Sequence, residues 1–290
     1  MSARVRRALV PLAPIVYEPL VRAALAEDFG LAGDITTEAT IPAGTLARAA
    51  LVTRARGVLA GRDAALFAFR LLDPQVRIET FVDDGEAMAP GTTIATFSGL
   101  AQGLLGAERT ALNLLSHLCG VATATARYVE ACGSSTCAVV ETRKTLPGLR
   151  ALEKYAVRAG GGKNHRLRLD DAILIKDNHI AIAGGIAAAL DRARDRMGHL
   201  VKLEIEVDSL SQLDEVLAHP ARADCILLDN FSLAELREAV RRAGGRVTLE
   251  ASGGVTLETI GEVAATGVDV ISVGALTHSV VALDIGLDIA

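Results

Sequence analysis

The sequence predicts an α/β protein in which a small α/β domain precedes a barrel built from βαβ units. Half of its 290 residues are hydrophobic, yet only 3% are aromatic and none is Trp. Such an Ala, Leu, Val and Ile content suits parallel sheets covered by helices. From about residue 137, short apolar runs each end in charged or small polar residues, as strands of a barrel do. An open doubly wound sheet would show similar runs and remains the alternative.

The N-terminal part contains segments with the spacing of apolar residues that helices have and segments with the alternation that strands have, as a small α/β domain does. Apolar residues recur at helical spacing in three segments, and partly alternating segments bounded by turn residues indicate strands. The predicted helices are residues 18–30, 63–72 and 106–118, and the predicted strands are 48–58, 76–82 and 92–97.

The later part contains six apolar runs that we predict to be parallel strands. Helix-like segments separate the later runs, which is the βαβ pattern with right-handed crossovers. In a barrel every strand ends at the same mouth, so the polar residues that follow the strands should meet there. The runs are 138–140, 173–175, 203–207, 226–228, 247–249 and 270–273.

Charge and cysteine content exclude several classes of protein. A net charge of −5 and a pI near 5.7 argue against a nucleic-acid or membrane-surface binder, which needs a basic face. The four cysteines form no CxxC pair and no metal-ligand spacing, so we expect reduced thiols in a cytoplasmic protein. We expect no signal peptide and no membrane-spanning segment.

Two sets of charged residues follow the predicted strands. Guanidinium forks and ammonium groups suit a small anion with several oxygens, whereas carboxylates without a basic neighbour in sequence suit Mg²⁺. Any one such residue is more often a solvated strand end, but six successive strands ending this way favour a site. The basic set is Arg143, Lys144, His165, Arg166 and Lys176, and the acidic set is Glu206 and Asp229.

A glycine-rich segment near the C-terminus predicts a phosphate site. Ser252-Gly253-Gly254 precedes a helix expected to begin near Thr256, and backbone N–H groups at such a place bind phosphate. Gly274 follows the next strand, which matches the phosphate position of many barrels. Each signal alone is weak, since Gly-Gly before a helix is more often a simple turn.

These motifs, in this order, resemble those of the quinolinate phosphoribosyltransferase family over nearly the whole chain. The most specific segments are TRKT, NHR, KDNH and ALTHS. In this numbering they are Thr142-Arg143-Lys144-Thr145, Asn164-His165-Arg166, Lys176-Asp177-Asn178-His179 and Ala275-Leu276-Thr277-His278-Ser279.

The resemblance implies an N-terminal α/β sandwich domain (1–116), an incomplete α/β barrel (117–277) and a C-terminal segment (278–290) packing back on the first domain. It implies transfer of phosphoribosyl from phosphoribosyl pyrophosphate to quinolinate with decarboxylation, giving nicotinate mononucleotide for NAD synthesis. It also implies Mg²⁺ as cofactor and a homodimer with shared sites, or a hexamer.

The resemblance also implies a role for each site residue. Quinolinate would be held by Arg143, His165, Arg166 and Lys176, with Arg109 entering from the partner subunit. Phosphoribosyl pyrophosphate and its Mg²⁺ would be served by Lys144, Glu206, Asp229, Ser252, Gly253, Gly274 and His278. The catalytic set would be Lys144, Glu206 and Asp229, with the two carboxylates as metal ligands.

Two departures from the family pattern and three rival functions stay open at this point. Arg168 stands where the family usually has glycine, so its loop could pack differently or bring another charge near the acid site. Residues 219–221 form a slight insertion remote from the mouth. The rivals are a paralogue associated with molybdenum transport, a non-catalytic phosphate-binding protein and a transferase specific for nicotinate.

Overall fold

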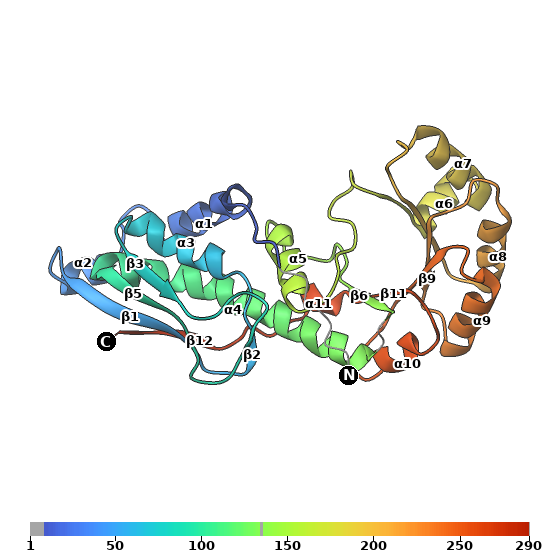
Figure 1. Ribbon diagram of the computed structural model, residues 1–290. Helices are drawn as coiled ribbons and strands as arrows, with labels where there is room; N and C mark the ends of the chain where they lie inside the picture. Colours follow the sequence, from blue (N-terminus) through green and yellow to red (C-terminus); the bar gives the residue numbers. More distant parts are fainter. Residues whose placement is uncertain (1–8, 134–135, 290) are drawn as a thin grey trace. The chain divides into compact units, whose positions relative to one another are not determined.

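The computed structural model describes residues 9–133 and 136–289, which form two compact units (Figure 1). The first unit is built around an antiparallel sheet and the second around a parallel sheet. The first contains the described residues up to Ala126, Thr145–Gly161 and those from Thr277 onward, and the second contains Arg127–Lys144 and Gly162–Leu276.

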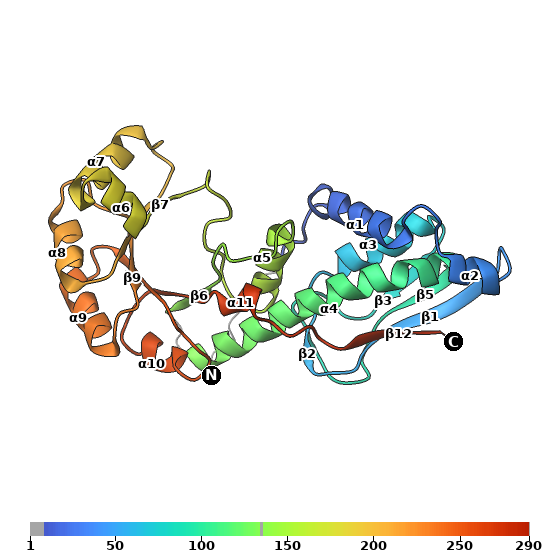
Figure 2. The ribbon, with the colours of Figure 1, turned by 180° about the vertical axis from the view of Figure 1, so that it is seen from behind.

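The first unit pairs a four-stranded antiparallel sheet with a layer of helices. The strand order is β12-β1-β5-β3, and helices α1, α3 and α4 lie on one side of this sheet (Figure 2). Phe69 and Phe97 bring the layers together, with ring centroids 4.3 Å apart. The strands are β1 (Leu46–Thr53), β3 (Arg77–Thr80), β5 (Thr93–Leu100) and β12 (Ile285–Ile289), and β2 (Gly57–Val58) pairs with β4 (Ala87–Met88). The helices are α1 (Pro14–Phe29), α2 (Ile35–Thr40), α3 (Arg62–Leu72), α4 (Ala101–Cys132) and α5 (Arg150–Ala159).

The α4 helix is much longer than the predicted helix 106–118 and continues through Gly120. A Cβ atom at Gly120 would lie 2.4 Å from the Val281 carbonyl oxygen, so glycine permits the C-terminal segment to approach the helix. The Leu283 N–H then donates to the Ser116 carbonyl, and β12 pairs with β1. Tertiary contact, rather than a break in the helix, explains this glycine.

Helix α5 belongs to the first unit, although the sequence analysis assigned residues 117–277 to a single barrel domain. Two side-chain contacts explain the grouping. Tyr155 donates its hydroxyl hydrogen to Asp84 at 2.8 Å, and His117 Nε2 lies 2.8 Å from the fully buried Glu153. Burial raises the pKa of Asp84, and the hydrogen bond from Tyr155 acts in the opposite direction because it favours the carboxylate.

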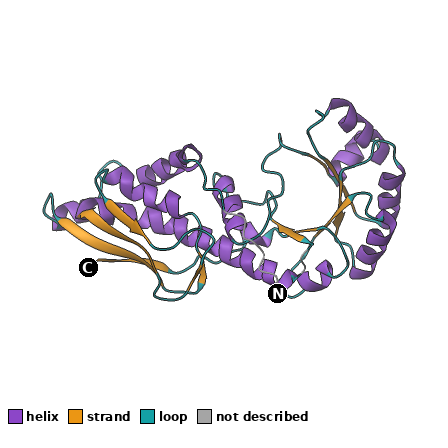
Figure 3. Ribbon diagram, in the orientation of Figure 1, coloured by secondary structure: helices purple, strands orange, loops and turns teal. Residues whose placement is uncertain are grey.

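The second unit contains a six-stranded parallel sheet in the order β6-β11-β10-β9-β8-β7. Its helices lie on the outer side of the curved strands (Figure 3). The strands are β6 (Ala138–Val140), β7 (Ile173–Ile175), β8 (Leu203–Val207), β9 (Cys225–Asp229), β10 (Thr248–Ser252) and β11 (Val270–Ser272). The helices are α6 (Asp177–Ala183), α7 (Ile186–Arg196), α8 (Leu210–Ala218), α9 (Leu233–Ala243) and α10 (Ile260–Ala264), with α11 (Ala275–His278) at the boundary.

This sheet is an incomplete barrel, as predicted. Lys163 forms an isolated parallel bridge with Val140 at the β6 edge, and no strand pairing joins that edge to β7 among the described residues. The core holds fully buried Leu203, Ile205 and Ile226 from adjacent strands. The predicted fold class is therefore confirmed, and the open doubly wound alternative is set aside.

Serine caps fix where two helices leave the sheet. Ser209 accepts from the Gln212 N–H before α8, and Ser232 with Glu235 forms a capping box before α9. The α10 helix begins only at Ile260, later than the Thr256 that the sequence indicated. Among the described residues, no helix is both long and apolar enough to cross a bilayer.

Candidate active site

Polar side chains gather at the carboxyl ends of three adjacent strands, β8, β9 and β10. Because side chains alternate between the two faces of a strand, residues two or four apart share a face. Register pairs Glu204 with Cys225 and Asp229 with Ser252. On this face Glu204 and Glu250 are buried, and we call these two residues and Cys225 the deeper layer. Glu206, Asp229 and Ser252 are half-buried and lie nearer the carboxyl end of their own strands.

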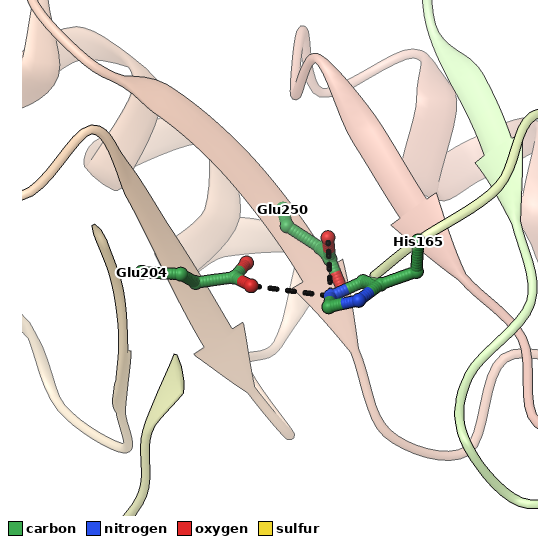
Figure 4. A group of neighbouring side chains, drawn as sticks. All are labelled: His165, Glu204 and Glu250. Carbon is green, nitrogen blue, oxygen red and sulfur yellow. Dashed lines mark ion pairs between the residues drawn. The ribbon is translucent and has the colours of Figure 1, made fainter. Parts of the chain in front are cut away.

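The deeper layer holds a histidine between two glutamates (Figure 4). His165 Nε2 lies 3.1 Å from Glu204 Oε2 and 3.6 Å from Glu250 Oε2. Both carboxyl groups are buried. Burial, and then the charge of Glu204, raises the pKa of Glu250 to about 7. Burial is the largest influence on Glu204 and acts to raise its pKa, but the hydrogen bond and charge of His165, the Cys225 thiol and the charge of Arg166 together outweigh it, so the pKa is lowered.

Two arginines lie close enough to repel each other. Burial, followed by the positive charge of Arg143, lowers the pKa of Arg166. Arg166 donates from Nη1 to the Ala172 carbonyl at 3.0 Å. Arg143 Nε is buried and has no hydrogen-bond partner in the part of the chain described. Two neighbouring guanidinium groups with unused donors form a place for an anion.

Lys176 connects the basic and acidic sets. Its Nζ donates to Glu206 Oε2 at 2.6 Å, with the lysine side chain 46% exposed and the glutamate 14% exposed. From the sequence we predict two separate subsites for these sets, because the acidic pair has no basic neighbour in sequence. The parallel pairing of β7 with β8 brings the two groups together.

The glycine-rich segment after β10 packs closely on the end of β9. Asn230 has φ of 57°, and its N–H donates to the Ser252 carbonyl. Its side-chain amide donates to Asp229 Oδ2 at 2.8 Å. A Cβ atom at Gly253 would lie 2.1 Å from Asn230 Oδ1, and Gly253 has φ of +96°. Only glycine fits this position without displacing Asn230.

The loop that carries His165 and Arg166 is held by its own polar groups. Asn164 donates to the fully buried Glu141 at 3.0 Å. The N–H groups of Leu167 and Arg168 both donate to Asp171, and the Arg168 side chain is exposed. Arg168, at the position where the family usually has glycine, is therefore compatible with the hydrogen bonds that hold this loop.

The remaining predicted residues lie as follows. Lys144 follows β6 and is exposed, and its N–H donates to Thr142 Oγ1. Gly274 follows β11 directly before α11. Arg109 and His278 belong to the first unit, so the structure does not place them against the parallel strands. Arg109 is 63% exposed on α4, with Glu108 3.9 Å away.

Sequence reasoning assigned no role to Glu204, Cys225 or Glu250. The sequence did contain one signal, which is a glutamate within a predicted strand that is otherwise apolar. Because a carboxylate is rarely buried without a partner, such a glutamate indicates a polar contact inside the protein. Their partner His165 lies on a loop far away in sequence, which no periodicity could reveal. Among the described residues, these two glutamates and His165 are the group whose possible metal-ligating atoms lie within 4.8 Å of one another.

Comparisons with known proteins match both units. A family model for the C-terminal domain of quinolinate phosphoribosyl transferase matches residues 121–288, and one for its N-terminal domain matches 34–119. A Mycobacterium leprae protein named nicotinate-nucleotide pyrophosphorylase (carboxylating) is 48% identical, covering 93% of this chain and 95% of that protein. A Bacillus subtilis protein named probable nicotinate-nucleotide pyrophosphorylase (carboxylating) is 43% identical, covering 91% and 90%. The crystal structure of NadC from Streptococcus pyogenes superposes with a TM-score of 0.92 at 39% identity, covering 97% of this chain and 99% of that one.

Proposed function

The chain belongs to the quinolinate phosphoribosyl transferase family, and from this membership we propose how its residues carry out the reaction. It is a decarboxylating quinolinate phosphoribosyltransferase of de novo NAD biosynthesis. It transfers phosphoribosyl from phosphoribosyl pyrophosphate to quinolinate, and the products are nicotinate mononucleotide, pyrophosphate and CO₂.

Arg143 and Arg166 are the residues that hold the two carboxylates of quinolinate. The observation that carries this assignment is the pair of neighbouring, partly buried guanidinium groups with a buried unpaired donor on Arg143. A dianion relieves their mutual repulsion and accepts their forked hydrogen bonds. Nicotinate has a single carboxylate and would leave one arginine uncompensated, so the site favours the diacid. Lys176 adds a third positive charge at the mouth.

The Ser252-Gly253 segment and Gly274 are proposed to bind the phosphates of phosphoribosyl pyrophosphate. The positive φ angle at Gly253 lets the backbone of this segment come close to a ligand. Exposed Lys144 supplies a compact positive charge for the departing pyrophosphate. On the basis of the family pattern, we propose that His278 also contacts phosphoribosyl pyrophosphate.

Glu206 and Asp229 are proposed to hold Mg²⁺. They lie at the ends of adjacent strands on one face of the sheet, and hard carboxylate oxygens are ligands that Mg²⁺ accepts. When bound, the ion would neutralise charge on the diphosphate. Lys176 occupies Glu206 through its ion pair, so the lysine has to exchange between this carboxylate and an anionic ligand.

The reaction then depends on orientation and charge. The ring nitrogen of quinolinate forms a bond to the ribose C1 as the bond from C1 to the pyrophosphate oxygen breaks. Holding the two substrates in line supplies about 7–11 kcal/mol of the barrier. The alkylated, positive ring nitrogen stabilises the electron pair that stays on the adjacent ring carbon when its carboxylate leaves as CO₂, and this carbon then takes up a proton. Arg143 and Arg166 hold the ring in place through both steps.

A parallel assay tests the function. The purified protein is incubated with phosphoribosyl pyrophosphate, Mg²⁺ and either quinolinate, nicotinate or nicotinamide, and mononucleotide and CO₂ are measured. We expect mononucleotide and CO₂ in equal amounts with quinolinate and no product with the other two acceptors. Product from nicotinate without CO₂ would identify a nicotinate-specific transferase instead.

We further propose a homodimer in which Arg109 completes the partner's site, and a hexamer that contains such dimers is the alternative assembly. The long, exposed side chain of Arg109 supports this, since its nearest acidic group lies 3.9 Å away on the adjacent residue. We also propose a cytoplasmic location. None of the four cysteines, all of which the structure describes, forms a disulfide, as is usual in a reducing compartment.

A further inference from the structure

An irregular segment follows β6 and contains Lys144. The strand ends at Val140 and α5 begins at Arg150, so residues 141–149 lie in neither a strand nor a helix. The chain also passes from the second unit to the first within this segment, between Lys144 and Thr145. Backbone of this kind depends on side chains to satisfy its polar groups and to fix its path. Regular structure alone therefore does not set the position of Lys144.

Glu153 on α5 holds the second half of this segment. The Leu146 N–H donates to Glu153 Oε2 at 3.2 Å. The Leu149 N–H donates to the Leu146 carbonyl at 3.1 Å, and the Glu153 N–H donates to the Leu149 carbonyl at 2.9 Å. Arg150 Nε donates to Thr145 Oγ1 at 3.0 Å at the start of the turn. Backbone and side chain of Glu153 together close a turn between Leu146 and α5.

The carboxyl group of Glu153 is itself held by α4, beside which α5 lies (Figure 1). Its second oxygen, Oε1, lies 2.8 Å from His117 Nε2, and the glutamate is fully buried. Burying a carboxyl group is costly unless its oxygens have hydrogen-bond partners, and here the partners are an imidazole and a backbone N–H. Helix α4 thus fixes the carboxyl group, which in turn fixes Leu146.

We propose that Glu153 is a positioning residue for Lys144 and acts through it on the departure of pyrophosphate. Consecutive Cα atoms are about 3.8 Å apart, so a fixed Leu146 confines the Lys144 Cα atom to within about 7.6 Å. On the other side, the Lys144 N–H donates to Thr142 Oγ1 at 3.0 Å. The backbone of Lys144 is held from both sides, which limits how far its ammonium group strays from a productive position. The proposal rests on the assignment of Lys144 to phosphoribosyl pyrophosphate.

Tyr155 provides a matched control, because it anchors the same helix at a different place. Its hydroxyl donates to Asp84 at 2.8 Å, and Tyr155 is buried like Glu153. This contact joins α5 to the loop between β3 and β4, not to the segment that follows Lys144. If Glu153 only stabilises α5, losing either contact should have the same consequences.

Hydrogen exchange provides the first test. Mass spectrometry of a peptide covering residues 145–149 reports on the Leu146 amide, and Pro147 contributes no N–H. We expect slow exchange in the unmodified protein and in Tyr155→Phe, and exchange about tenfold faster or more in Glu153→Ala. Exchange in the unmodified protein as fast as in an unstructured peptide would overturn the proposal, whether or not any variant folds.

Kinetics of the variants provide the second test. Glu153→Ala should lower kcat/KM for phosphoribosyl pyrophosphate about tenfold, with little change in quinolinate affinity. Glu153→Gln should restore normal kinetics, because its amide oxygen can accept from Leu146 and its NH₂ group can donate to His117 once that ring carries its hydrogen on Nδ1. Tyr155→Phe should lower the melting temperature and leave kcat/KM unchanged.

A double variant tests the route of the effect. In the Lys144→Ala background, Glu153→Ala should cause no further loss of kcat/KM, because the glutamate acts through that lysine. A further loss there would show that Glu153 acts elsewhere, and equal losses in Glu153→Ala and Tyr155→Phe would show that it only stabilises α5. Either result overturns the proposal. An unmodified protein that makes no mononucleotide from quinolinate would instead refute the function, while hydrogen exchange would still decide whether Glu153 fixes the segment.

Discussion

Lys176 Nζ lies 2.6 Å from Glu206 Oε2, so a residue proposed to bind quinolinate is paired with a residue proposed to bind Mg²⁺. The pair is partly exposed, which limits its contribution to stability. Its significance is that binding at one subsite changes the charge available at the other. On the proposed assignments, a ligand carboxylate that draws Lys176 away would release Glu206 for the metal.

Lys176→Ala and Arg143→Ala should each weaken quinolinate binding, by different amounts. Lys176 is half exposed, so solvent screens its charge and we expect about a tenfold loss. Arg143 is partly buried and we expect a loss of ~3 kcal/mol, or about 100-fold. Calorimetric titration measures both, with Lys202→Ala as a matched surface control. Unchanged affinity in both variants would refute the basic site.

Glu206→Ala and Asp229→Ala should raise the Mg²⁺ concentration needed for half-maximal activity, by roughly tenfold or more. Losing one carboxylate from a site with two removes both a ligand and a negative charge. A metal titration of initial rates measures the effect, and Asp214→Ala removes a carboxylate that pairs with Arg242 instead. If the titration curves match that of the unmodified enzyme, the acidic pair is structural.

Most of the parallel sheet could be predicted from the sequence, because strands buried on both faces form continuous apolar runs. The predicted run 173–175 coincides with β7, and 138–140 coincides with β6. The Lys176–Glu206 pair could not be predicted, because it depends on the register of β7 and β8. The deeper layer was missed for the same reason. A loop histidine reaches two glutamates on different strands, and sequence spacing contains no such information.

Gly253→Ala should lower the affinity for phosphoribosyl pyrophosphate and the melting temperature. The new Cβ would meet Asn230 Oδ1 at 2.1 Å, and the φ of +96° is unfavourable for alanine. Gly254→Ala is the matched control, since its φ is +60° and nothing lies within 4 Å of the added atom. It should show backbone strain alone, of about 1–2 kcal/mol. Equal effects of the two changes on substrate affinity would argue against close packing as the cause.

Glu250 should make the protein less stable as pH rises. Burial and the charge of Glu204 raise its pKa from 4.5 to about 7, so the folded protein holds this proton more tightly than the unfolded chain. The stability that the proton contributes is complete below about pH 4.5 and is lost as pH rises through about 7. The unfolding free energy of the unmodified protein should therefore exceed that of Glu250→Gln by more at pH 5 than at pH 8.

The comparison with Glu250→Gln isolates one group among several. Asp84 also has a raised pKa and acts in the same direction, but both proteins contain it. His165 and Ser272 influence the pKa of Glu250 and are likewise unchanged. Urea titrations at equal protein concentration measure the difference. An identical gap at both pH values would show that Glu250 does not titrate between them.

Arg109 lies on α4 in the first unit and has an exposed side chain. If Arg109 completes the partner's site, each active site takes Arg143 from one subunit and Arg109 from the other. Arg109→Ala and Arg143→Ala then damage the same site from different chains. Each variant alone should be nearly inactive at limiting quinolinate. Unfolded and refolded together, they should regain about a quarter of normal activity, because half of the randomly paired dimers are mixed and each has one intact site. Refolding each variant alone is the control. Mixed dimers that are detected by mass spectrometry yet remain inactive would show that Arg109 serves its own chain or no site at all.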